Sequence, residues 1–459
     1  MVFHTDTIVA LSTPPGRSAI GVVRISGPDA LKILRMLIAS ESFDPQPNLL
    51  SLKNLIDPAT RETLDQALVC FFKAPHSFTG EDLVELHCHG SPVLLRSIIE
   101  IILQQDARLA EPGEFSLRAV ANGRLKLTEA EAIRDLIAAQ TDAALRQSTR
   151  QLKGEISKTL QPAKDELLKL IVRLESSLEF VEDDLPALES QKIVSSLKEL
   201  RRDLEKLAGT FRQGKLLRDG LTVALVGRPN VGKSSLFNML LGRGRAIVTE
   251  IPGTTRDTIT ESIGLNGVPL ILIDTAGIRS SIDEIESIGV ERTRRAAADA
   301  DLLIVVIDGA TDLSDEDRHV LAEVANTKHI IALNKSDLES FSVARLGGAS
   351  VPQDSSAVIS VSAKTEAGLE RLRAAILKPF ANGGAQSESL LITNSRHHDL
   401  LVRSLVAIES SERLVDEVAS EELILVGLHN ALRHLDEITG ETTTEEILGQ
   451  IFSTFCIGK

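Results

Sequence analysis

The chain has 459 residues, 43% hydrophobic and 25% charged, a composition typical of globular proteins with about two to four domains. Its 65 Asp and Glu outnumber its 50 Lys and Arg, for a net charge of -15, which argues against a general nucleic-acid coat because phosphate binding needs basic surface. A local basic patch is compatible with that balance. Only 3% of the residues are aromatic, without Trp or Tyr, so stacking on single-stranded bases would fall to Phe.

The cysteines indicate a reduced compartment, because Cys70, Cys88 and Cys456 lie far apart and form no metal-type pair. The first residues lack the basic segment and apolar core of a signal peptide, and no apolar run approaches the ~20 residues that span a bilayer. We therefore expect a soluble, cytoplasmic protein with no membrane partner.

Residues 1–118 have the pattern of a mixed α/β domain. Its predicted strands are 7–10, 19–25, 66–72 and 83–88, and its predicted helices are 29–38 and 93–104. Arg24 and Glu85 are charges inside otherwise apolar strands, where a charge is costly unless it is paired, used or solvated. The sequence leaves these options open.

His87 and His89 alternate about Cys88 and therefore share one face of a strand. A metal site needs a third ligand, and none lies nearby in the sequence. Polar residues at a strand end are the better interpretation.

From about residue 128 the pattern becomes helical, with apolar residues at intervals of three and four over 167–178 and 193–207. Pro162 and Pro186 are expected to break this region into antiparallel helices. Basic residues then cluster at Arg201, Arg202, Lys206, Arg212, Lys215 and Arg218. They either form a solvated helix face with i,i+4 pairs, the commoner arrangement, or contact RNA phosphate.

The most informative stretch is VALVGRPNVGKSS, residues 223–235. An apolar strand leads into Gly227-x-x-x-x-Gly232-Lys233-Ser234 and then into helical spacing, which is the context of a phosphate-binding loop. Backbone N–H groups and the helix N-terminus would hold an anion. Lys233 would reach the β- and γ-phosphates, and the Ser234 hydroxyl would bind magnesium.

Three further segments, each after an apolar strand, complete a guanine-nucleotide domain. Asp274 opens Asp-Thr-Ala-Gly and is placed to hold magnesium. Asp337 closes Asn-Lys-Ser-Asp, and its carboxylate can accept the two donors that guanine has and adenine lacks. Ser-Ala-Lys, residues 362–364, can bring a backbone N–H to the guanine oxygen. This domain is predicted to be inserted between helical segments that pack into one bundle.

Smaller signals support this organisation. Asn266-Gly267 predicts a tight hairpin between two strands. Gly383-Gly384-Ala385 indicates a linker. The last helix is expected to start at a capping-box pattern over 442–445. It would bury Ile447, Leu448, Ile451 and Phe452.

The group that activates hydrolysis is less evident. Ile278 stands where many small GTPases have a Gln that orients water, although Asp283, Glu284 and Glu286 follow. No arginine finger can be identified, although Arg256 and Arg279 are candidates. Asn230 either holds a monovalent cation, together with backbone carbonyls of residues 249–255, or only stabilises the loop.

These residues together resemble the MnmE (TrmE) family of bacterial and organellar tRNA-modification GTPases. The resemblance covers nearly the whole chain, through DTIVALSTPPGR, FTGEDLVELHCHGSP, AEPGEFSLRAVANGR, GRPNVGKSSLFN, IPGTTRD, DTAGIR and FCIGK. It implies a multidomain α/β fold. The domains would be an N-terminal α+β tetrahydrofolate-binding and dimerisation domain (1–118), a discontinuous α-helical domain (119–214 and 384–459) and an inserted P-loop α/β G domain (215–383).

The resemblance also implies a reaction. The family works with the FAD- and NADH-using protein MnmG, as a homodimer within a heterotetrameric or larger complex. Together they add aminomethyl or carboxymethylaminomethyl groups to carbon 5 of the wobble uridine of certain tRNAs. The one-carbon donor would be 5-formyl- or 5,10-methylene-tetrahydrofolate. Potassium would activate GTP hydrolysis, in agreement with the missing arginine finger.

Residue roles follow from the matching motifs. Folate would be held by Arg24, Glu85, Arg124 and Lys459, potassium by Asn230, Thr249, Ile251 and Thr254, and magnesium by Ser234 and Thr255, while Glu286 would orient the attacking water. The residues around GTP would be Asn230, Val231, Gly232, Lys233, Ser234, Ser235, Thr249, Glu250, Ile251, Pro252, Gly253, Thr254, Thr255, Asp274, Thr275, Ala276, Gly277, Asn334, Lys335, Asp337, Ser362, Ala363 and Lys364. Cys456 would be either a functional thiol or a structural one.

Two positions depart from the family pattern. Arg124 stands where Lys is usual, which keeps the charge but alters the hydrogen-bond geometry. Lys126 stands where Asp is common, which changes the charge balance near the folate pocket. An alternative function of another class is a regulatory GTP switch, such as a ribosome-assembly factor that acts only by binding. Folate binding by residues 1–118 separates the two, because a switch has no use for it.

Overall fold

The computed structural model describes residues 6–179, 187–242, 259–274, 300–346, 358–378, 389–417, 419–442 and 445–458. The chain forms two compact units. Unit 1 comprises residues 1–137, 151–194 and 406–459, and unit 2 comprises 138–150 and 195–405. The division passes within two long helices, α7 (Ala187–Gly209) and α13 (Ser395–Asp416).

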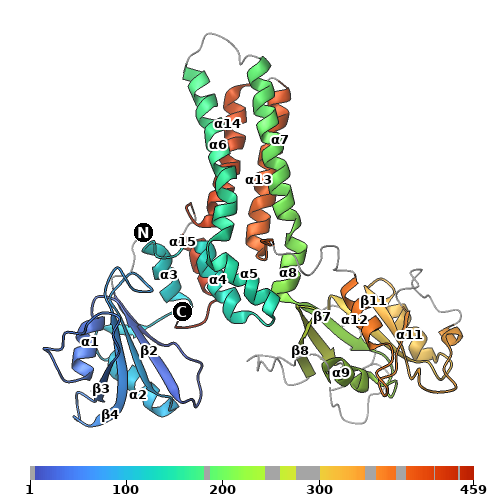
Figure 1. Ribbon diagram of the computed structural model, residues 1–459, viewed down its shortest axis with the longest axis horizontal. Helices are drawn as coiled ribbons and strands as arrows, with labels where there is room; N and C mark the ends of the chain where they lie inside the picture. Colours follow the sequence, from blue (N-terminus) through green and yellow to red (C-terminus); the bar gives the residue numbers. More distant parts are fainter. Residues whose placement is uncertain are drawn as a thin grey trace. The chain divides into compact units, whose positions relative to one another are not determined.

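Unit 1 contains a six-stranded sheet in the order β3-β4-β5-β2-β1-β6. Figure 1 draws this sheet in shades of blue. Its strands are β1 (Thr7–Leu11), β2 (Ile20–Ser26), β3 (Ser51–Ile56), β4 (Thr63–Phe72), β5 (Leu83–His89) and β6 (Ala107–Leu109). The four predicted strands are present, and the sequence prediction missed β3 and β6. The edge strand β3 buries few of its residues and β6 is three residues long, so neither has a clear apolar pattern.

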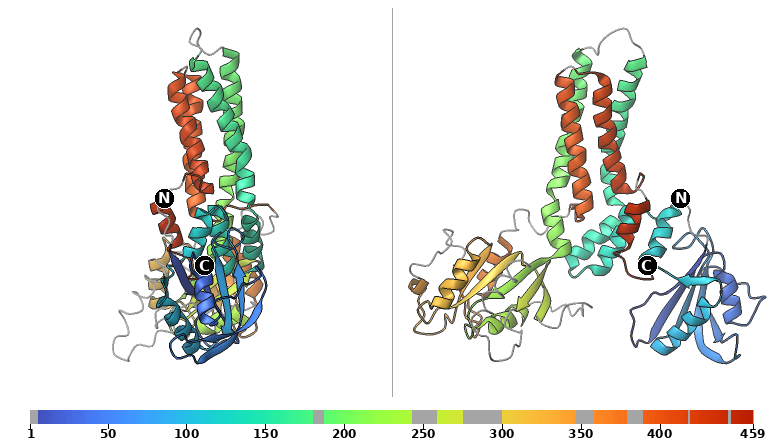
Figure 2. Two further views of the ribbon diagram at one scale, coloured as in Figure 1. Left: turned by 90° about the vertical axis from the view of Figure 1, so that its left-hand side faces the viewer. Right: turned by 180° about the vertical axis from the view of Figure 1, so that it is seen from behind.

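Helices α1 (Ala30–Leu37) and α2 (Pro92–Leu103) cover one face of this sheet, as Figure 2 also shows. The core between them includes Val23, Leu34, Leu86 and Ile98, all fully buried. Residues of alternate parity, Arg24, Glu85 and His87 among them, point to the opposite face. There Phe115 of α3 (Glu114–Ala121) packs against Ile8 and Ala10.

The remaining helices of unit 1 correct two predictions. Pro162 does not break a helix but lies inside α6 (Glu155–Glu179), where a proline costs about 3 kcal/mol. Burial of Leu167, Ile171 and Leu174 in the same helix, which packs along α14 (Glu421–Thr439), offsets that cost. In α15 (Glu445–Phe452), Leu448 and Phe452 are buried as expected, but Ile447 is exposed because it points away from α3 and α4 (Leu127–Ala138).

Unit 2 contains a second six-stranded sheet, in the order β12-β11-β10-β7-β9-β8. Its strands are β7 (Leu221–Val226), β8 (Ile259–Leu265), β9 (Val268–Asp274), β10 (Leu302–Asp308), β11 (His329–Asn334) and β12 (Val358–Ser360). All neighbours are parallel except β8 and β9. That antiparallel pair is joined by the predicted hairpin, with positive φ at Asn266 (50°) and Gly267 (86°).

Helices cover both faces of this sheet. Helices α9 (Lys233–Gly242) and α12 (Leu369–Leu377) share one core with it, and α11 (Asp315–Val324) lies in the core on the other face. Helices α5 (Asp142–Leu152) and α8 (Phe211–Asp219) lie near β8 and β9. The carboxyl ends of the parallel strands therefore meet at one edge, which is where an open α/β sheet binds ligands.

Along α7, the basic residues pair with acids on the same helix. Arg201 lies 3.6 Å from Glu205, and Lys206 lies 3.1 Å from Asp203. Such i,i+3 and i,i+4 pairs are what a solvated helix face has, and contact of these residues with RNA phosphate stays a prediction. Pro186 and Gly383-Gly384-Ala385 lie outside the described residues, as do two residues of the expected cap at 442–445.

Candidate active site

The phosphate-binding loop leaves β7 at its carboxyl end and enters α9. Asn230 and Gly232 both have positive φ, 64° and 97°. A Cβ on Gly232 would lie 2.3 Å from the Asn334 side-chain nitrogen, so this position requires glycine. Lys233 folds back and donates from Nζ to the carbonyls of Gly227 (2.8 Å) and Arg228 (2.9 Å). The loop thus has the closed shape of an anion-binding nest.

The proposed magnesium ligands that fall within the described residues lie together. The Ser234 hydroxyl donates to Oδ2 of Asp274 at 3.1 Å, and Asp274 is the buried last residue of β9. Hydroxyl and carboxylate oxygens are the donors that Mg²⁺ prefers, so this pair fits the ion.

The base-recognition segments converge on the phosphate loop through Asn334. Its Nδ2 donates to the Val231 carbonyl at 2.9 Å, and its Oδ1 accepts from the Ala363 backbone N–H at 3.0 Å. One buried amide therefore ties the loop to the segment after β12. Lys335, with φ of 65°, donates to Asp308 Oδ2 at 2.6 Å.

Asp337 presents a carboxylate at this edge. The Ser362 hydroxyl donates to its Oδ1 at 2.6 Å, and this hydrogen bond lowers the pKa of Asp337 below its ordinary value. The backbone N–H groups of Lys364 and Thr365 bond to the same hydroxyl, at 3.3 and 3.1 Å. Asp337 is thus held ionised, the form that accepts two hydrogen bonds from a guanine edge.

A second polar site lies on the open face of the first sheet. Arg24 donates from Nε and Nη2 to Oε1 of Glu85, at 3.0 and 2.7 Å, and their side chains are only 17% and 16% exposed. His87 Nε2 lies 3.3 Å from the other oxygen of Glu85. Arg24 Nη1 also donates to the Gly458 carbonyl at 3.2 Å, which brings the chain's C-terminal segment to this face. The alternative that both charges face water is therefore wrong.

Aromatic rings surround this pair. The guanidinium carbon of Arg24 lies 5.5 Å from the Phe78 ring centroid and 5.7 Å from that of Phe115. Arg124 donates from Nε to the Ser77 carbonyl at 3.0 Å. The buried Ser77 hydroxyl has no hydrogen-bond partner among the described residues. A fixed carboxylate, guanidinium groups, aromatic faces and a spare buried hydroxyl suit a planar, polar heteroaromatic ligand such as a pterin.

Comparison with known proteins identifies the family. A model described as MnmE helical domain matches residues 127–456, and one described as GTP-binding protein TrmE N-terminus matches residues 7–124. The tRNA modification GTPase MnmE of Koribacter versatilis (strain Ellin345) is 46% identical over 457 residues, which cover 99% of each chain. The chain belongs to the MnmE family of tRNA modification GTPases. The MnmE of Aquifex aeolicus (strain VF5) is 41% identical over 456 residues, 99% of this chain and 100% of that protein.

Among solved structures, the G domain of the T. maritima FeoB iron transporter is 31% identical and covers 35% of this chain and 99% of that chain, with a TM-score of 0.26. Several residues that the MnmE motifs assign lie outside the described residues. They are Thr249, Glu250, Ile251, Pro252, Gly253, Thr254, Thr255, Thr275, Ala276, Gly277, Glu286 and Lys459.

The residues assigned from the MnmE motifs do not include all of the N-terminal site. Phe78, Phe115 and the Arg118–Glu81 ion pair lie beside the assigned residues. All of these residues belong to FTGEDLVELHCHGSP or AEPGEFSLRAVANGR. Their place in these two family motifs was the sequence signal that could have assigned them to the site. His87 pairs with Glu85, and His89 pairs with Asp65. Among the residues that the structure describes, no three or more His, Cys, Asp or Glu side chains lie close enough together to hold a metal ion.

Proposed function

We propose that this chain is a potassium-activated GTPase that works with MnmG to modify carbon 5 of the wobble uridine in certain tRNAs, using a folate one-carbon donor. One observation carries the proposal. In a chain of the MnmE family, Asn334 bonds both to the phosphate loop and to the segment at residue 363, beside the carboxylate expected to recognise guanine. A cytoplasmic location accompanies this function. No helix within the described ranges is long and apolar enough to cross a bilayer.

Nucleotide binding would use the residues of the phosphate loop. Lys233 would exchange the Gly227 and Arg228 carbonyls for β- and γ-phosphate oxygens. Ser234 and Asp274, joined at 3.1 Å, would hold magnesium, with Thr255 as a further ligand assigned by motif. Bound magnesium would neutralise charge between the phosphates.

Potassium would replace the missing arginine finger. Asn230 lies within the phosphate loop and has a left-handed backbone conformation (φ 64°). Its side-chain oxygen is proposed to bind the cation together with Thr249, Ile251 and Thr254. Glu286 is proposed to orient the attacking water, because Ile278 stands where many small GTPases have a Gln for that task. A finger-type cation accelerates hydrolysis by about 10³–10⁵.

The test is GTP hydrolysis by the full chain in potassium and in sodium at equal ionic strength. We expect strong acceleration in potassium, which Glu286→Ala abolishes without loss of GTP binding. Equal, slow rates in both salts would contradict the potassium mechanism and point to an outside activating protein instead.

Folate would bind on the open face of the first sheet. Arg24 and Glu85 form its fixed polar pair, Phe78 and Phe115 its aromatic walls, and Arg124 a further cation. Lys459, one residue beyond Gly458 and outside the described residues, is assigned by motif. Binding of 5-formyltetrahydrofolate by calorimetry tests this site, and complete absence of binding would favour a GTP switch without one-carbon chemistry.

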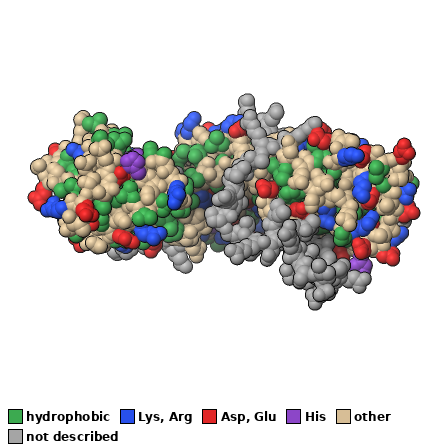
Figure 3. All heavy atoms as spheres, turned by 90° about the horizontal axis from the view of Figure 1, so that it is seen from below, with side chains coloured by type: hydrophobic (Ala, Val, Ile, Leu, Met, Phe, Trp, Pro, Cys, Tyr) green, Lys and Arg blue, Asp and Glu red, His purple; other side chains and the backbone are tan. Residues whose placement is uncertain are grey.

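A homodimer is proposed to form through the N-terminal unit. Leu52 and Leu68 are paired across β3 and β4 and are 58% and 41% exposed, on the same face as Glu85. Leu49 and Leu50 nearby are 52% and 51% exposed. Figure 3 shows hydrophobic side chains (green) among charged ones on one face of the N-terminal part, at left. A second copy would cover this patch, and Leu52→Lys with Leu68→Lys should yield a monomer in light scattering.

A further inference from the structure

The segment between β4 and β5, residues 77–82, lies beside the Arg24–Glu85 pair and is fastened to the end of α3. Asn122 donates from Nδ2 to the Thr79 carbonyl at 2.7 Å. Arg124 holds the Ser77 carbonyl at 3.0 Å. Both contacts are accepted by backbone carbonyls of the segment, so they do not depend on its side chains.

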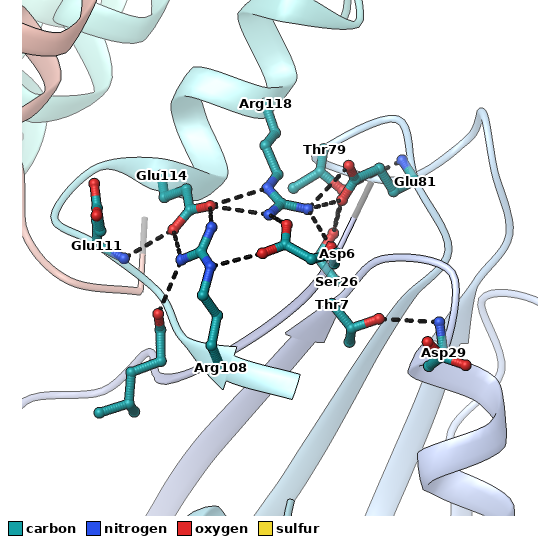
Figure 4. A network of polar contacts seen from close by, with 11 residues as sticks. Asp6, Thr7, Ser26, Asp29, Thr79, Glu81, Arg108, Glu111, Glu114 and Arg118 are labelled. Carbon is teal, nitrogen blue, oxygen red and sulfur yellow. Dashed lines mark hydrogen bonds and ion pairs between the residues drawn. The ribbon is translucent and has the colours of Figure 1, made fainter. Parts of the chain in front are cut away.

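A third attachment holds the side chain of Glu81 through the buried Arg118 (Figure 4). Arg118 donates from Nη1 to both carboxylate oxygens of Glu81, each at 3.2 Å. Its Nη2 donates to Asp6 Oδ1 at 2.7 Å and to Glu114 Oε1 at 2.9 Å, and its side chain is only 7% exposed. Ser26 Oγ donates to Glu81 Oε2 at 2.8 Å. The carboxylate of Glu81 is therefore held from two directions.

The carboxylates of this network favour the charged form of Arg118. Burial by itself would lower the pKa of Arg118, but Glu81 and Glu114 outweigh that effect and raise it. An ionised pair with several fixed hydrogen bonds has one preferred geometry, whereas an exposed pair samples many. The network therefore limits the movement of Glu81 and of the residues next to it in sequence.

Phe78 belongs to the same segment as Glu81. Its ring lies 5.5 Å from the Arg24 guanidinium and packs against the buried cluster that contains Phe115 and Ile8. We propose that Glu81, held by Arg118, is a positioning residue for the folate pocket: it fixes the 77–82 segment so that Phe78 stays against Arg24. This inference rests on the proposed folate function and adds a role that the motif assignments do not give.

The experiment measures binding of 5-formyltetrahydrofolate to the full-length Glu81→Gln variant, together with amide hydrogen exchange over residues 77–82. We expect the affinity for 5-formyltetrahydrofolate to fall about tenfold, because part of the binding free energy is then used to order the segment. Hydrogen exchange of the segment should accelerate, and GTP hydrolysis should not change. Ser26→Ala, which removes the hydroxyl donor to Glu81, should act in the same direction with a smaller effect.

Arg108→Gln is the matched control. Arg108 binds Asp6 and Glu114, on the other side of Arg118 from Glu81 (Figure 4). It should lower the melting temperature at least as much as Glu81→Gln but leave folate affinity within about twofold. Unchanged affinity in Glu81→Gln, or equal losses in both variants, would overturn the positioning role. Failure of the unaltered chain itself to bind folate would instead refute the folate assignment on which it rests.

Discussion

Arg24 and Glu85 face each other across neighbouring strands, and two nitrogens of the guanidinium share one carboxylate oxygen at 3.0 and 2.7 Å. Both side chains are mostly buried on the open face of the first sheet. A largely buried ion pair with aromatic neighbours adds little to stability by itself, because desolvation offsets the attraction between the charges. Its value lies in presenting fixed donors and acceptors to a ligand.

Arg24→Lys should therefore weaken binding of 5-formyltetrahydrofolate by about tenfold or more, because an ammonium group cannot reproduce the planar contacts of the guanidinium. Calorimetry on the full chain measures the change, with GTP hydrolysis as an internal standard. Arg96→Lys, exposed on α2 at the opposite face, is the control and should bind normally. Equal affinity in the two variants would remove Arg24 from the folate site.

Asp337→Asn should change base selectivity. The variant should bind GTP about 10- to 100-fold more weakly, because guanine donors lose their ionised acceptor. It should gain affinity for xanthosine triphosphate, whose carbonyl can accept from the new amide. Competition binding measures both effects. Asp312→Asn, whose side chain is 88% exposed, is the control and should leave selectivity unchanged.

Glu114→Gln should lower stability in a pH-dependent way. Burial opposes ionisation of Glu114, but hydrogen bonds from Arg108, the Glu111 N–H and Arg118 outweigh it and lower its pKa from the ordinary value of 4.5. A depressed pKa stabilises the fold above the unfolded-state value, and this stabilisation is lost as pH falls through the folded-state value. The substitution should thus cost about 1–3 kcal/mol at neutral pH.

The cost should shrink as pH falls from 4.5, where the unfolded-state carboxyl takes up a proton, to the lower pKa of the folded state, where the native carboxylate does. Thermal unfolding of the two full chains between pH 7 and pH 3.5 tests this trend. Asp399→Asn, which breaks an exposed pair with Arg403, should cost less than about 0.5 kcal/mol at every pH. A pH-independent cost of Glu114→Gln would show that its charge does not stabilise the fold.

The three cysteines should differ in reactivity. Burial raises the pKa of Cys88 to about 12, and burial also raises the pKa of Cys70, with the charge of Glu85 adding to it. Cys456 is exposed. Iodoacetamide at pH 8 should therefore modify Cys456 alone in the folded chain, and all three after denaturation. Peptide mass spectrometry reads the pattern, and rapid labelling of Cys88 in the native protein would contradict its burial.

The nucleotide site was largely predictable from sequence. Each of its segments follows an apolar run, and parallel strands bring their carboxyl ends to one edge, so local motifs imply a shared location. The expected strands β7, β9, β11 and β12 all support it. Asp274 stands at the end of β9 and Asn334 at the end of β11, where the motifs placed them. The domain boundaries at 118, 214 and 383 stay predictions.

The N-terminal site was predictable only as separate motifs. The sequence showed two isolated charges, Arg24 and Glu85, and could not decide whether they met, because their contact depends on the register between β2 and β5. Pro162 illustrates the opposite limit, since local propensity predicted a break that burial along α6 overrides.

The sequence by itself determined the chemistry of the G domain, because its ligands are set by short motifs at the ends of strands. Tertiary structure alone decided which distant groups meet. Arg118 reaches Asp6, 112 residues away, and Glu81, 37 residues away. It does so because α3 packs over the sheet beside β1, and a buried guanidinium needs carboxylates wherever the fold can supply them. No local pattern encodes such a pairing, since only packing brings its members within hydrogen-bond distance.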